Sequence, residues 1–318
     1  MPNVFFATSG MPRAIASIRR DAAGQPQTLP VAIADGDTIG LHLEGSGSIR
    51  FLGIDTPEKT FDLPGTGGSN LNSAQWEAYL TDPFQPQFGP FDLDADLEAH
   101  LGTRIGPGAG VNHRLHGDNA EQALITLVQS DIAALGQIPA TFQFFIAFSF
   151  EVFDTYGRFL AFINRNQPNA NNPSPRPLAY NERMLESGSA LPYFIWPNID
   201  PFRSLPLLSS VIAPGTANTV AEATPALKRA RNFVQQARAG GIGVFNPANP
   251  LRFEAFEVRY LGRREAPNRA VIDLSKNDDV ILRPQNYFSI PNPEDRLFIP
   301  TAFVPLFASR GWKLEGWF

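Results

Sequence analysis

The chain contains no cysteine, and this absence removes several kinds of chemistry at once. Without thiols there is no disulfide framework, no thiolate metal site and no cysteine nucleophile. No run of about eighteen apolar residues occurs either, so we expect no membrane span. The first residues lack a charged segment followed by an apolar one. The default expectation is therefore a cytoplasmic protein, or a secreted one whose signal peptide has been removed.

Charged residues are scarce, at 18% of 318 residues, and the net charge is −5. This argues against a protein that coats nucleic acid non-specifically, because such binding depends on an excess of Lys and Arg. A nuclease stays compatible with it, since a bound metal supplies positive charge at the scissile phosphate. Phenylalanine (26 residues) and proline (29 residues) are abundant instead, and apolar residues make up 43% of the chain. This composition favours short strands and long ordered loops around a buried core.

Two acidic motifs follow predicted strands near the start of the chain. Asp35-Gly-Asp37-Thr ends the first strand, and Asp55-Thr-Pro-Glu58 ends the second. Residues 44–47, Glu-Gly-Ser-Gly, are a turn signal between the strands. If the strands pair as neighbours, the Asp37 and Asp55 carboxylates meet at one end of a sheet. Arg50 lies on the strand that leads to Asp55.

These residue types suit metal-assisted phosphate-ester chemistry. Carboxylate oxygens hold Ca²⁺ or Mg²⁺, and the bound ion polarises a phosphoryl oxygen. A guanidinium matches the geometry of a phosphate, and a further carboxylate can take a proton from water. Either motif alone is more often an ordinary turn, because Asp, Gly and Pro are common turn residues. Both motifs together, with Arg50 between them, favour the functional interpretation.

The rest of the chain divides into predicted elements and one predicted insertion. Residues 59–117 read as an insertion rich in acidic residues, with a short helix around residues 73–80. Caps and apolar spacing predict helices over residues 118–135, 180–186 and 224–239. Alternation predicts strands over residues 13–20, 141–153, 158–163, 253–261, 270–274 and 280–282. Residues 298–312 are expected to form a helix disturbed by Pro305.

Four other features admit a functional alternative, and in each the structural interpretation is favoured. Residues 92–98 carry alternating acids but lack the glycine and the final glutamate of an EF-hand loop, so a solvated loop is expected. His113 and His116 lack a full zinc-ligand pattern. The phenylalanines of residues 141–153 are expected in the core rather than in a base-stacking platform. The basic face of residues 224–239 is expected to be solvated.

Three ordered motifs resemble the staphylococcal (thermonuclease-type) nuclease family. They are Asp-Gly-Asp-Thr at residues 35–38, Arg-Phe-Leu-Gly-Ile-Asp-Thr-Pro-Glu at residues 50–58 and Asp-Thr-Tyr-Gly-Arg-Phe-Leu-Ala at residues 154–161. The resemblance covers roughly residues 30–245. It implies a mainly β or α+β fold, an OB-type five-stranded barrel with three helices. The expected domains are residues 1–245, containing the insertion 59–117, and a C-terminal module of unknown role at residues 246–318.

The resemblance also implies roles for particular residues. Ca²⁺, with Mg²⁺ or Mn²⁺ as alternatives, would be held by Asp37, Asp55 and the backbone carbonyl of Thr56. Glu58 would assist the attacking water, and Arg50 and Arg158 would bind the phosphate. The remaining matches are Asp35 near the metal, and Tyr156 and Tyr193 as substrate contacts. The implied reaction is hydrolysis of DNA and/or RNA that leaves 3′-phosphates.

The chain also departs from the family pattern. It is acidic where the family's type protein is basic, and Thr155 stands where a lysine near the substrate phosphate is found. A non-catalytic OB-fold module that binds nucleic acid or protein is therefore the second hypothesis. A structural or protein-interaction domain is the third. The intact set of acids and arginines weighs against both.

Overall fold

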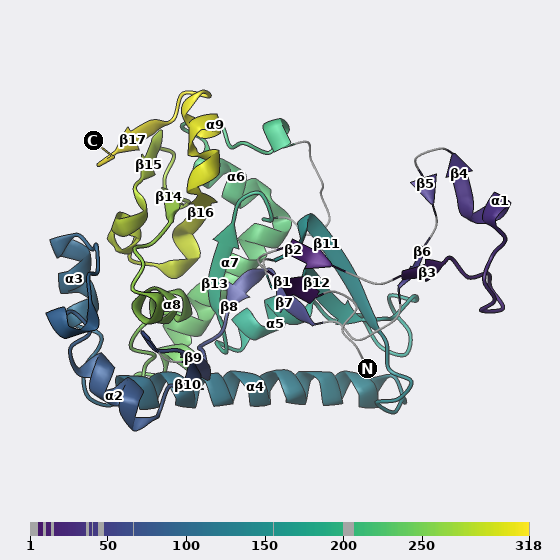
Figure 1. The fold of residues 1–318 in the computed structure, drawn as a ribbon, viewed down its shortest axis with the longest axis horizontal. Helices are drawn as coiled ribbons and strands as arrows, with labels where there is room; N and C mark the ends of the chain where they lie inside the picture. The colour runs from purple at the N-terminus through teal and green to yellow at the C-terminus, as the bar shows by residue number, and fades with distance from the viewer. Residues whose placement is uncertain are drawn as a thin grey trace. The chain divides into compact units, whose positions relative to one another are not determined.

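The computed structural model describes residues 6–8, 11–13, 16–35, 38–39, 41–43, 48–65, 67–154, 156–199 and 207–317 (Figure 1). The chain divides into two compact units. Unit 1 comprises Met1–Arg50 and Phe148–Ala161, and unit 2 comprises Phe51–Ala147 and Phe162–Phe318. Helices and sheets are mixed in the described ranges, and no closed barrel is found there. The five-stranded OB-type barrel therefore stays a prediction. No helix in those ranges has both the length and the apolar character needed to cross a membrane.

Unit 1 is built mostly from short strands paired in antiparallel fashion. The pairs are β1 (Phe6–Thr8) with β2 (Met11–Arg13), β3 (Ala16–Ile18) with β6 (Leu41–Leu43), and β4 (Ile33–Asp35) with β5 (Thr38–Ile39). A short helix, α1 (Leu29–Ala32), precedes β4. Strands β11 (Phe144–Phe153), β12 (Phe159–Arg165) and β7 (Ile49–Phe51) form a three-stranded sheet in that order, of which residues 49–50, 148–153 and 159–161 belong to unit 1. The predicted strand and return strand at residues 141–153 and 158–163 are thus confirmed.

Unit 2 is organised around a six-stranded sheet of order β17-β15-β14-β16-β13-β8. Its strands are β8 (Gly53–Asp55), β13 (Leu191–Ile195), β14 (Arg269–Asp273), β15 (Val280–Leu282), β16 (Arg296–Pro300) and β17 (Lys313–Glu315). Strand β8 pairs antiparallel with β13, and β13 pairs parallel with β16. Residues 246–318 were expected to form a separate module. They contribute β14 to β17 to the same six-stranded sheet that has β8, the strand of Asp55, at its edge. A separate hairpin, β9 (Thr60–Asp62) with β10 (Gly68–Asn70), follows β8.

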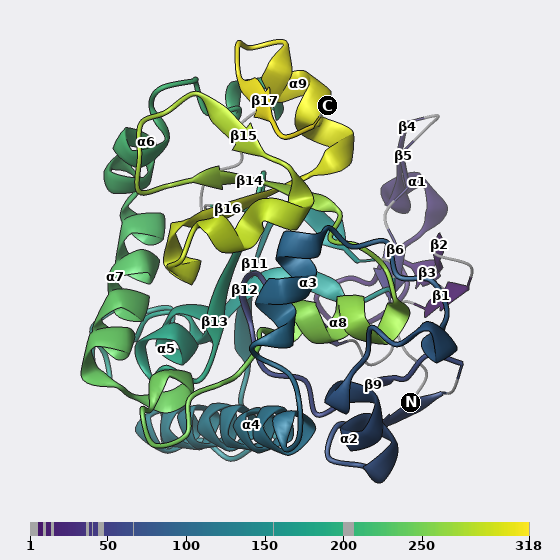
Figure 2. The same ribbon diagram turned by 90° about the vertical axis from the view of Figure 1, so that its left-hand side faces the viewer.

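Helices cover both faces of this sheet (Figures 1 and 2). Successive strand residues point to opposite faces. Ile272 and Leu297 therefore pack in one core with α5 (Tyr180–Glu186), α6 (Ala217–Ala223) and α7 (Pro225–Gly240). Val271 and Phe298 pack in a second core with α2 (Ala74–Thr81), α3 (Ala95–Gly102) and α8 (Ala255–Arg263). The remaining helices are α4 (Ala109–Ala134) and α9 (Val304–Ala308).

Several predicted elements are confirmed. Helices α2, α5 and α7 lie at the predicted positions. The Ser73 side chain caps α2 by accepting a hydrogen bond from the Trp76 N–H, whereas Thr224 occupies the N-cap position of α7 without a side-chain cap hydrogen bond. Strands β14 and β15 match the predicted residues 270–274 and 280–282. Short 3-10 turns complete the chain at Pro86–Phe88, Leu207–Ser209, Gly243–Phe245, Pro284–Ser289, Pro293–Asp295 and Thr301–Phe303.

The predicted start of α4 is wrong. The helix begins at Ala109 rather than at residue 118, so the end of the predicted insertion is helical. The Glu77 carboxylate explains this, because it accepts hydrogen bonds from the N–H groups of Gly108 (2.7 Å) and Val111 (2.9 Å). It thereby satisfies backbone donors that a helix start leaves unpaired. The predicted stop is confirmed, since Gly136 has a φ of +62°.

Four further predictions are also wrong. Residues 253–261 form α8 rather than a strand, started by a capping box between Glu254 and Glu257. Residues 298–312 hold the end of β16 and the short α9 rather than one helix. The phenylalanines of β11 were expected in the core, but Phe144 and Phe145 are 43% and 52% exposed. Helix α3 begins inside the acidic stretch 92–98, which was expected to be a solvated loop.

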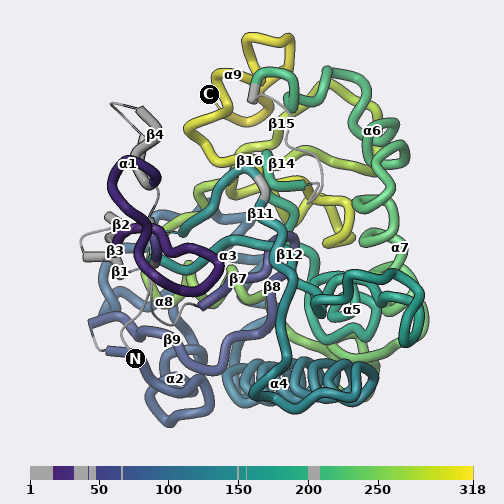
Figure 3. The backbone as a smooth tube through the Cα atoms, turned by 90° about the vertical axis from the view of Figure 1, so that its right-hand side faces the viewer, coloured from purple at the N-terminus to yellow at the C-terminus, as the bar shows by residue number. Residues whose placement is uncertain are grey.

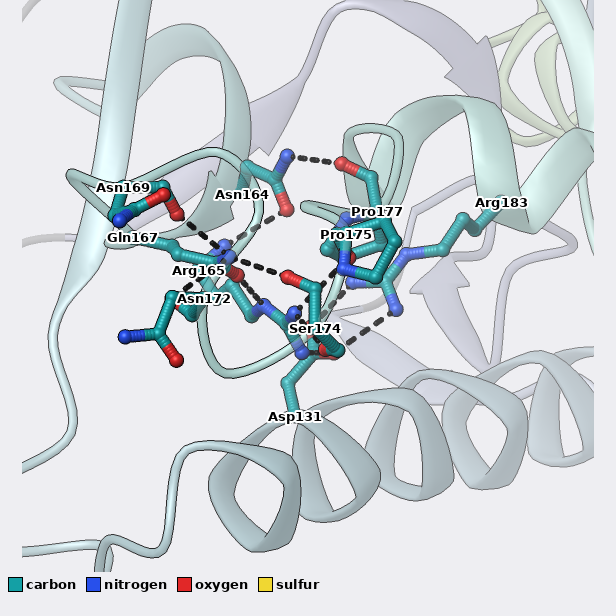
Figure 4. A network of polar contacts seen from close by, with 10 residues as sticks. All are labelled: Asp131, Asn164, Arg165, Gln167, Asn169, Asn172, Ser174, Pro175, Pro177 and Arg183. Carbon is teal, nitrogen blue, oxygen red and sulfur yellow. Dashed lines mark hydrogen bonds and ion pairs between the residues drawn. The ribbon is translucent and has the colours of Figure 1, made fainter.

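Helices α4 and α5 lie next to each other (Figure 3). A buried ion cluster fixes α4 to α5 and to the loop after β12 (Figure 4). Asp131 of α4 accepts hydrogen bonds from Arg165 Nη1 (3.2 Å) and Arg183 Nη2 (2.5 Å). Arg165 also donates to Gln167 Oε1 (2.7 Å) and Ser174 Oγ (3.0 Å). The Asp131 side chain is only 4% exposed. Each buried charge in this cluster therefore has a partner, as burial requires.

Replacing Asp131 with alanine is expected to lower the free energy of unfolding by about 3–5 kcal/mol, because two guanidinium groups lose their buried carboxylate. Urea denaturation followed by circular dichroism measures the change. Asp118→Ala is the control, since this aspartate is 44% exposed and pairs with Arg114 and Lys59 at the surface. The control should cost about 1 kcal/mol or less. Equal losses in the two variants would contradict the role given to the cluster.

Candidate functional site

The candidate site lies where β8 leaves the six-stranded sheet. Asp55 is the last residue of β8 and is paired with Leu191 of β13. Pro57 follows two positions later and has no N–H to donate, which suits a strand that stops here. The two acids of this segment differ in burial. Asp55 is 5% exposed, whereas the Glu58 side chain is 26% exposed.

Helix α4 supports the back of this segment at very short range. A Cβ atom at Gly117 would lie 2.8 Å from the Pro57 carbonyl oxygen, so glycine is needed for the approach. One turn earlier, His113 Nε2 accepts a hydrogen bond of 2.9 Å from the Glu58 N–H. Burial lowers the pKa of His113 to about 3, so the ring is neutral and can act as this acceptor. The His113 side chain of α4 thus holds the backbone of Glu58 in place.

The zinc alternative for the histidine pair finds no support in this arrangement. Nε2 of His113 is bonded to the Glu58 N–H, and Nε2 of His116 lies 3.0 Å from the carbonyl oxygen of Asn249. Both nitrogens therefore have backbone partners. The two histidines act as packing and positioning groups for the loops around them.

Arg259 of α8 joins the two acids. Its Nη2 lies 2.6 Å from Asp55 Oδ2, and its Nη1 lies 3.1 Å from Asp55 Oδ1 and 2.8 Å from Glu58 Oε1. The guanidinium thus binds Asp55 with both terminal nitrogens and shares one of them with Glu58, the fork geometry that arginine favours. Burial acts to lower the pKa of Arg259, but Asp55, Tyr193 and Glu58 together outweigh it and hold the pKa well above the ordinary value.

Tyr193 of β13 completes the surroundings of Arg259. The centre of its ring lies 5.8 Å from the Arg259 Cζ and 5.5 Å from the Arg269 Cζ. Its hydroxyl accepts a hydrogen bond of 2.8 Å from Arg269 Nη1, and its ring stacks on Phe256 at 5.4 Å. Tyr193 was predicted to contact substrate. The structure places it beside two guanidinium groups in the interior.

The other predicted site residues lie in unit 1. Arg50 lies in β7, and Asp35 is the last residue of β4. Arg158 donates a hydrogen bond of 2.6 Å from Nε to Asp154 Oδ2, with the centre of the Tyr156 ring 5.3 Å from its Cζ. Asp37 lies outside the described residues. The structure therefore brings Asp55, Thr56, Glu58 and Tyr193 together in unit 2, and Arg158 and Tyr156 together in unit 1.

The oxygen donors of this segment decide whether it suits the predicted metal ion. Asp55, Glu58 and the Thr56 carbonyl offer hard oxygen ligands of the kind that Ca²⁺ takes. Both oxygens of Asp55, however, are already bonded to Arg259. Among the residues that the structure describes, no group of three or more His, Asp or Glu side chains is arranged to hold a metal ion. As placed, these residues fit a guanidinium and not a divalent metal.

Sequence reasoning missed Arg259 because it placed residues 253–261 on a strand. The signal that would have corrected this is the Glu254-x-x-Glu257 pattern, which forms the capping box of α8. A correct helix would still not have revealed the partner. Arg259 and Asp55 are 204 residues apart in the chain, and no local pattern relates them.

Comparison with known proteins identified no relative of this chain. No family model, curated protein or solved structure matches the chain. The interpretation of the site therefore rests on its own residues and on the three motifs.

The neutral state of His113 generates a pH prediction. The unfolded chain takes up a proton near the ordinary histidine pKa of 6.5, whereas the folded protein does so only near a pKa of about 3. This contribution to stability is full above about pH 6.5 and is lost as the pH falls toward 3. His113→Gln keeps an acceptor for the Glu58 N–H and removes the ionisable ring.

Relative to His113→Gln, the wild type should lose up to about 1.4 kcal/mol of unfolding free energy per pH unit below about pH 6.5. Urea denaturation of both proteins from about pH 7.5 to about pH 4.5 measures this difference, and the titration of the other groups cancels between them. Parallel pH profiles would show that His113 is not held neutral.

Proposed function

We propose that the protein hydrolyses phosphodiester bonds in DNA and/or RNA, with the segment from Asp55 to Glu58 as its reactive centre. The observation that carries the proposal is the convergence of both acids on one cationic group, the Arg259 guanidinium. These two acids are therefore not those of an ordinary exposed turn. The order and internal spacing of the three motifs support the same conclusion.

Glu58 is the residue best suited to act as general base. It is more exposed than Asp55, and its backbone is held by His113. In the proposed step, water gives a proton to the Glu58 carboxylate while its oxygen attacks the phosphorus. The bond from phosphorus to the 5′ oxygen breaks, and that oxygen takes a proton from solvent. The products carry a 3′-phosphate and a 5′-hydroxyl.

Charge develops on the phosphoryl oxygens as the water attacks, and nearby cations would stabilise it. Phosphate binding by Arg50 and Arg158 follows from the motif resemblance and belongs to the proposal. Dependence on Ca²⁺, with Mg²⁺ or Mn²⁺ as alternatives, belongs to it as well. The OB-type barrel is proposed on the same basis, and helices α4, α5 and α7 support it because they overlap the three expected helices.

A non-catalytic module that binds nucleic acid or protein is the second candidate, and one observation favours it. Arg259 neutralises Asp55 and pairs with Glu58, as a purely structural ion cluster would. This candidate requires only a stable fold around the cluster. It differs from the enzyme in predicting no cleavage of nucleic acid under any metal condition.

Glu58→Gln should reduce the cleavage rate of DNA or RNA by about 100-fold or more, because the amide cannot accept the proton. Arg158→Ala should reduce it as well, through the loss of phosphate binding. Cleavage of labelled single- and double-stranded substrates is measured with Ca²⁺, Mg²⁺, Mn²⁺ and a chelator. Glu121→Gln is the matched control, since this glutamate pairs with Lys59 on the surface of α4 and should leave the rate within about twofold.

The proposed nuclease activity would be contradicted if the folded wild-type protein cleaved neither DNA nor RNA with any of these ions. Binding of the same oligonucleotides without cleavage would then favour the second candidate. Cleavage that is equally fast in wild type and Glu58→Gln would keep the activity but remove Glu58 from its role.

A further inference from the structure

We propose that Arg259 is a built-in counter-ion that occupies the cation position between Asp55 and Glu58, so that a divalent ion binds there only after the guanidinium is displaced. This inference rests on the proposed function, because it concerns the same two carboxylates. It adds to the proposed site Arg259, a residue outside all three motifs. It also makes metal binding depend on displacement of the Arg259 guanidinium.

The contacts of Arg259 leave little of Asp55 for another cation. The two terminal nitrogens take one oxygen each of Asp55, at 2.6 and 3.1 Å, and the nearer oxygen of Glu58 lies at 2.8 Å. Ca²⁺ needs the same carboxylate oxygens at about 2.3–2.6 Å. An ion at that distance would lie close to the guanidinium, and two positive charges so close repel each other strongly.

The surroundings of Arg259 strengthen this competition. Arg269 lies against the same Tyr193 ring, so a second positive charge sits next to the site. The pair of Arg259 with Asp55 is almost fully buried, with side chains 14% and 5% exposed. Buried pairs are screened far less by salt and water than surface pairs. Displacement of the guanidinium is therefore costly, and it lowers the apparent affinity for a metal.

The free energy needed to displace the guanidinium determines how many molecules have Asp55 released from Arg259. The apparent dissociation constant for the ion is the intrinsic one divided by the fraction of molecules in which Asp55 is free of Arg259. Removing the guanidinium raises that fraction to one. The variant keeps both carboxylates.

Calorimetric titration with Ca²⁺ alone tests the inference on the full-length chain. Arg259→Gln should bind Ca²⁺ at least about tenfold more tightly than the wild type. Arg229→Gln is the matched control, because Arg229 also projects from a helix and donates from Nε to a carboxylate, Glu182, at 2.6 Å. Its Ca²⁺ affinity should stay within about twofold of the wild type.

A second measurement uses the wild type, because Arg259→Gln removes a buried ion pair and can lower stability. NMR of ¹⁵N-labelled protein follows the guanidinium N–H signals of individual arginines. The N–H protons of a buried, paired guanidinium exchange slowly with water, so slow exchange indicates that the contact is present. Addition of Ca²⁺ should remove the protection of Arg259 and leave that of Arg165 in the Asp131 cluster unchanged.

Unchanged Ca²⁺ affinity in a folded Arg259→Gln variant would overturn the inference, and so would the absence of Ca²⁺ binding in both proteins. Protection of Arg259 that persists at saturating Ca²⁺ would overturn it too. Failure of the proposed function has a different signature. Tighter Ca²⁺ binding in Arg259→Gln, without cleavage of nucleic acid by the wild type, would support the counter-ion role and reject the nuclease. Cleavage by the wild type, with unchanged Ca²⁺ affinity in Arg259→Gln, would support the nuclease and reject the counter-ion role.

Discussion

The ion pair between Asp55 and Arg259 is the interaction on which the candidate site depends. A carboxylate that is 5% exposed loses most of its hydration, and that loss is tolerable only with a paired, well-oriented cation. The pair joins the end of β8 to α8, two segments 204 residues apart. Glu58 shares the same guanidinium, and Tyr193 lies against it. The position of α8 therefore sets the geometry of both acids.

This dependence gives the C-terminal residues a role in the site. The chain from residue 246 onward supplies α8 and the strands β14 to β17 of the sheet whose edge strand is β8. On the other side, α4 comes close enough for the Glu58 N–H to reach His113 because Gly117 has no side chain. The Asp55–Glu58 segment is thus held between a helix that precedes β11 and a helix near the C-terminus.

Local signals in the sequence were enough to predict elements whose causes are local. Thr224 and Pro225 mark the start of α7, and alternation marks β14 and β15. Elements with distant causes were missed. The start of α4 depends on the Glu77 carboxylate, which no pattern near residue 109 reveals. Apolar spacing in residues 253–261 resembles a strand because the helix there is buried on nearly every side. The acids of the site were found from their motif, but their counter-ion was not.

A pair of crystal structures, grown with and without Ca²⁺, would test the central claim most directly, namely that Asp55 and Glu58 form one cation position shared by Arg259 and a metal. Without Ca²⁺, Arg259 should bridge both acids. With Ca²⁺, an ion should lie about 2.3–2.6 Å from carboxylate oxygens of Asp55, with the Arg259 guanidinium withdrawn. Arg259 bonded to Asp55 in both crystals, with no ion at these oxygens, would contradict the claim and leave a structural ion cluster.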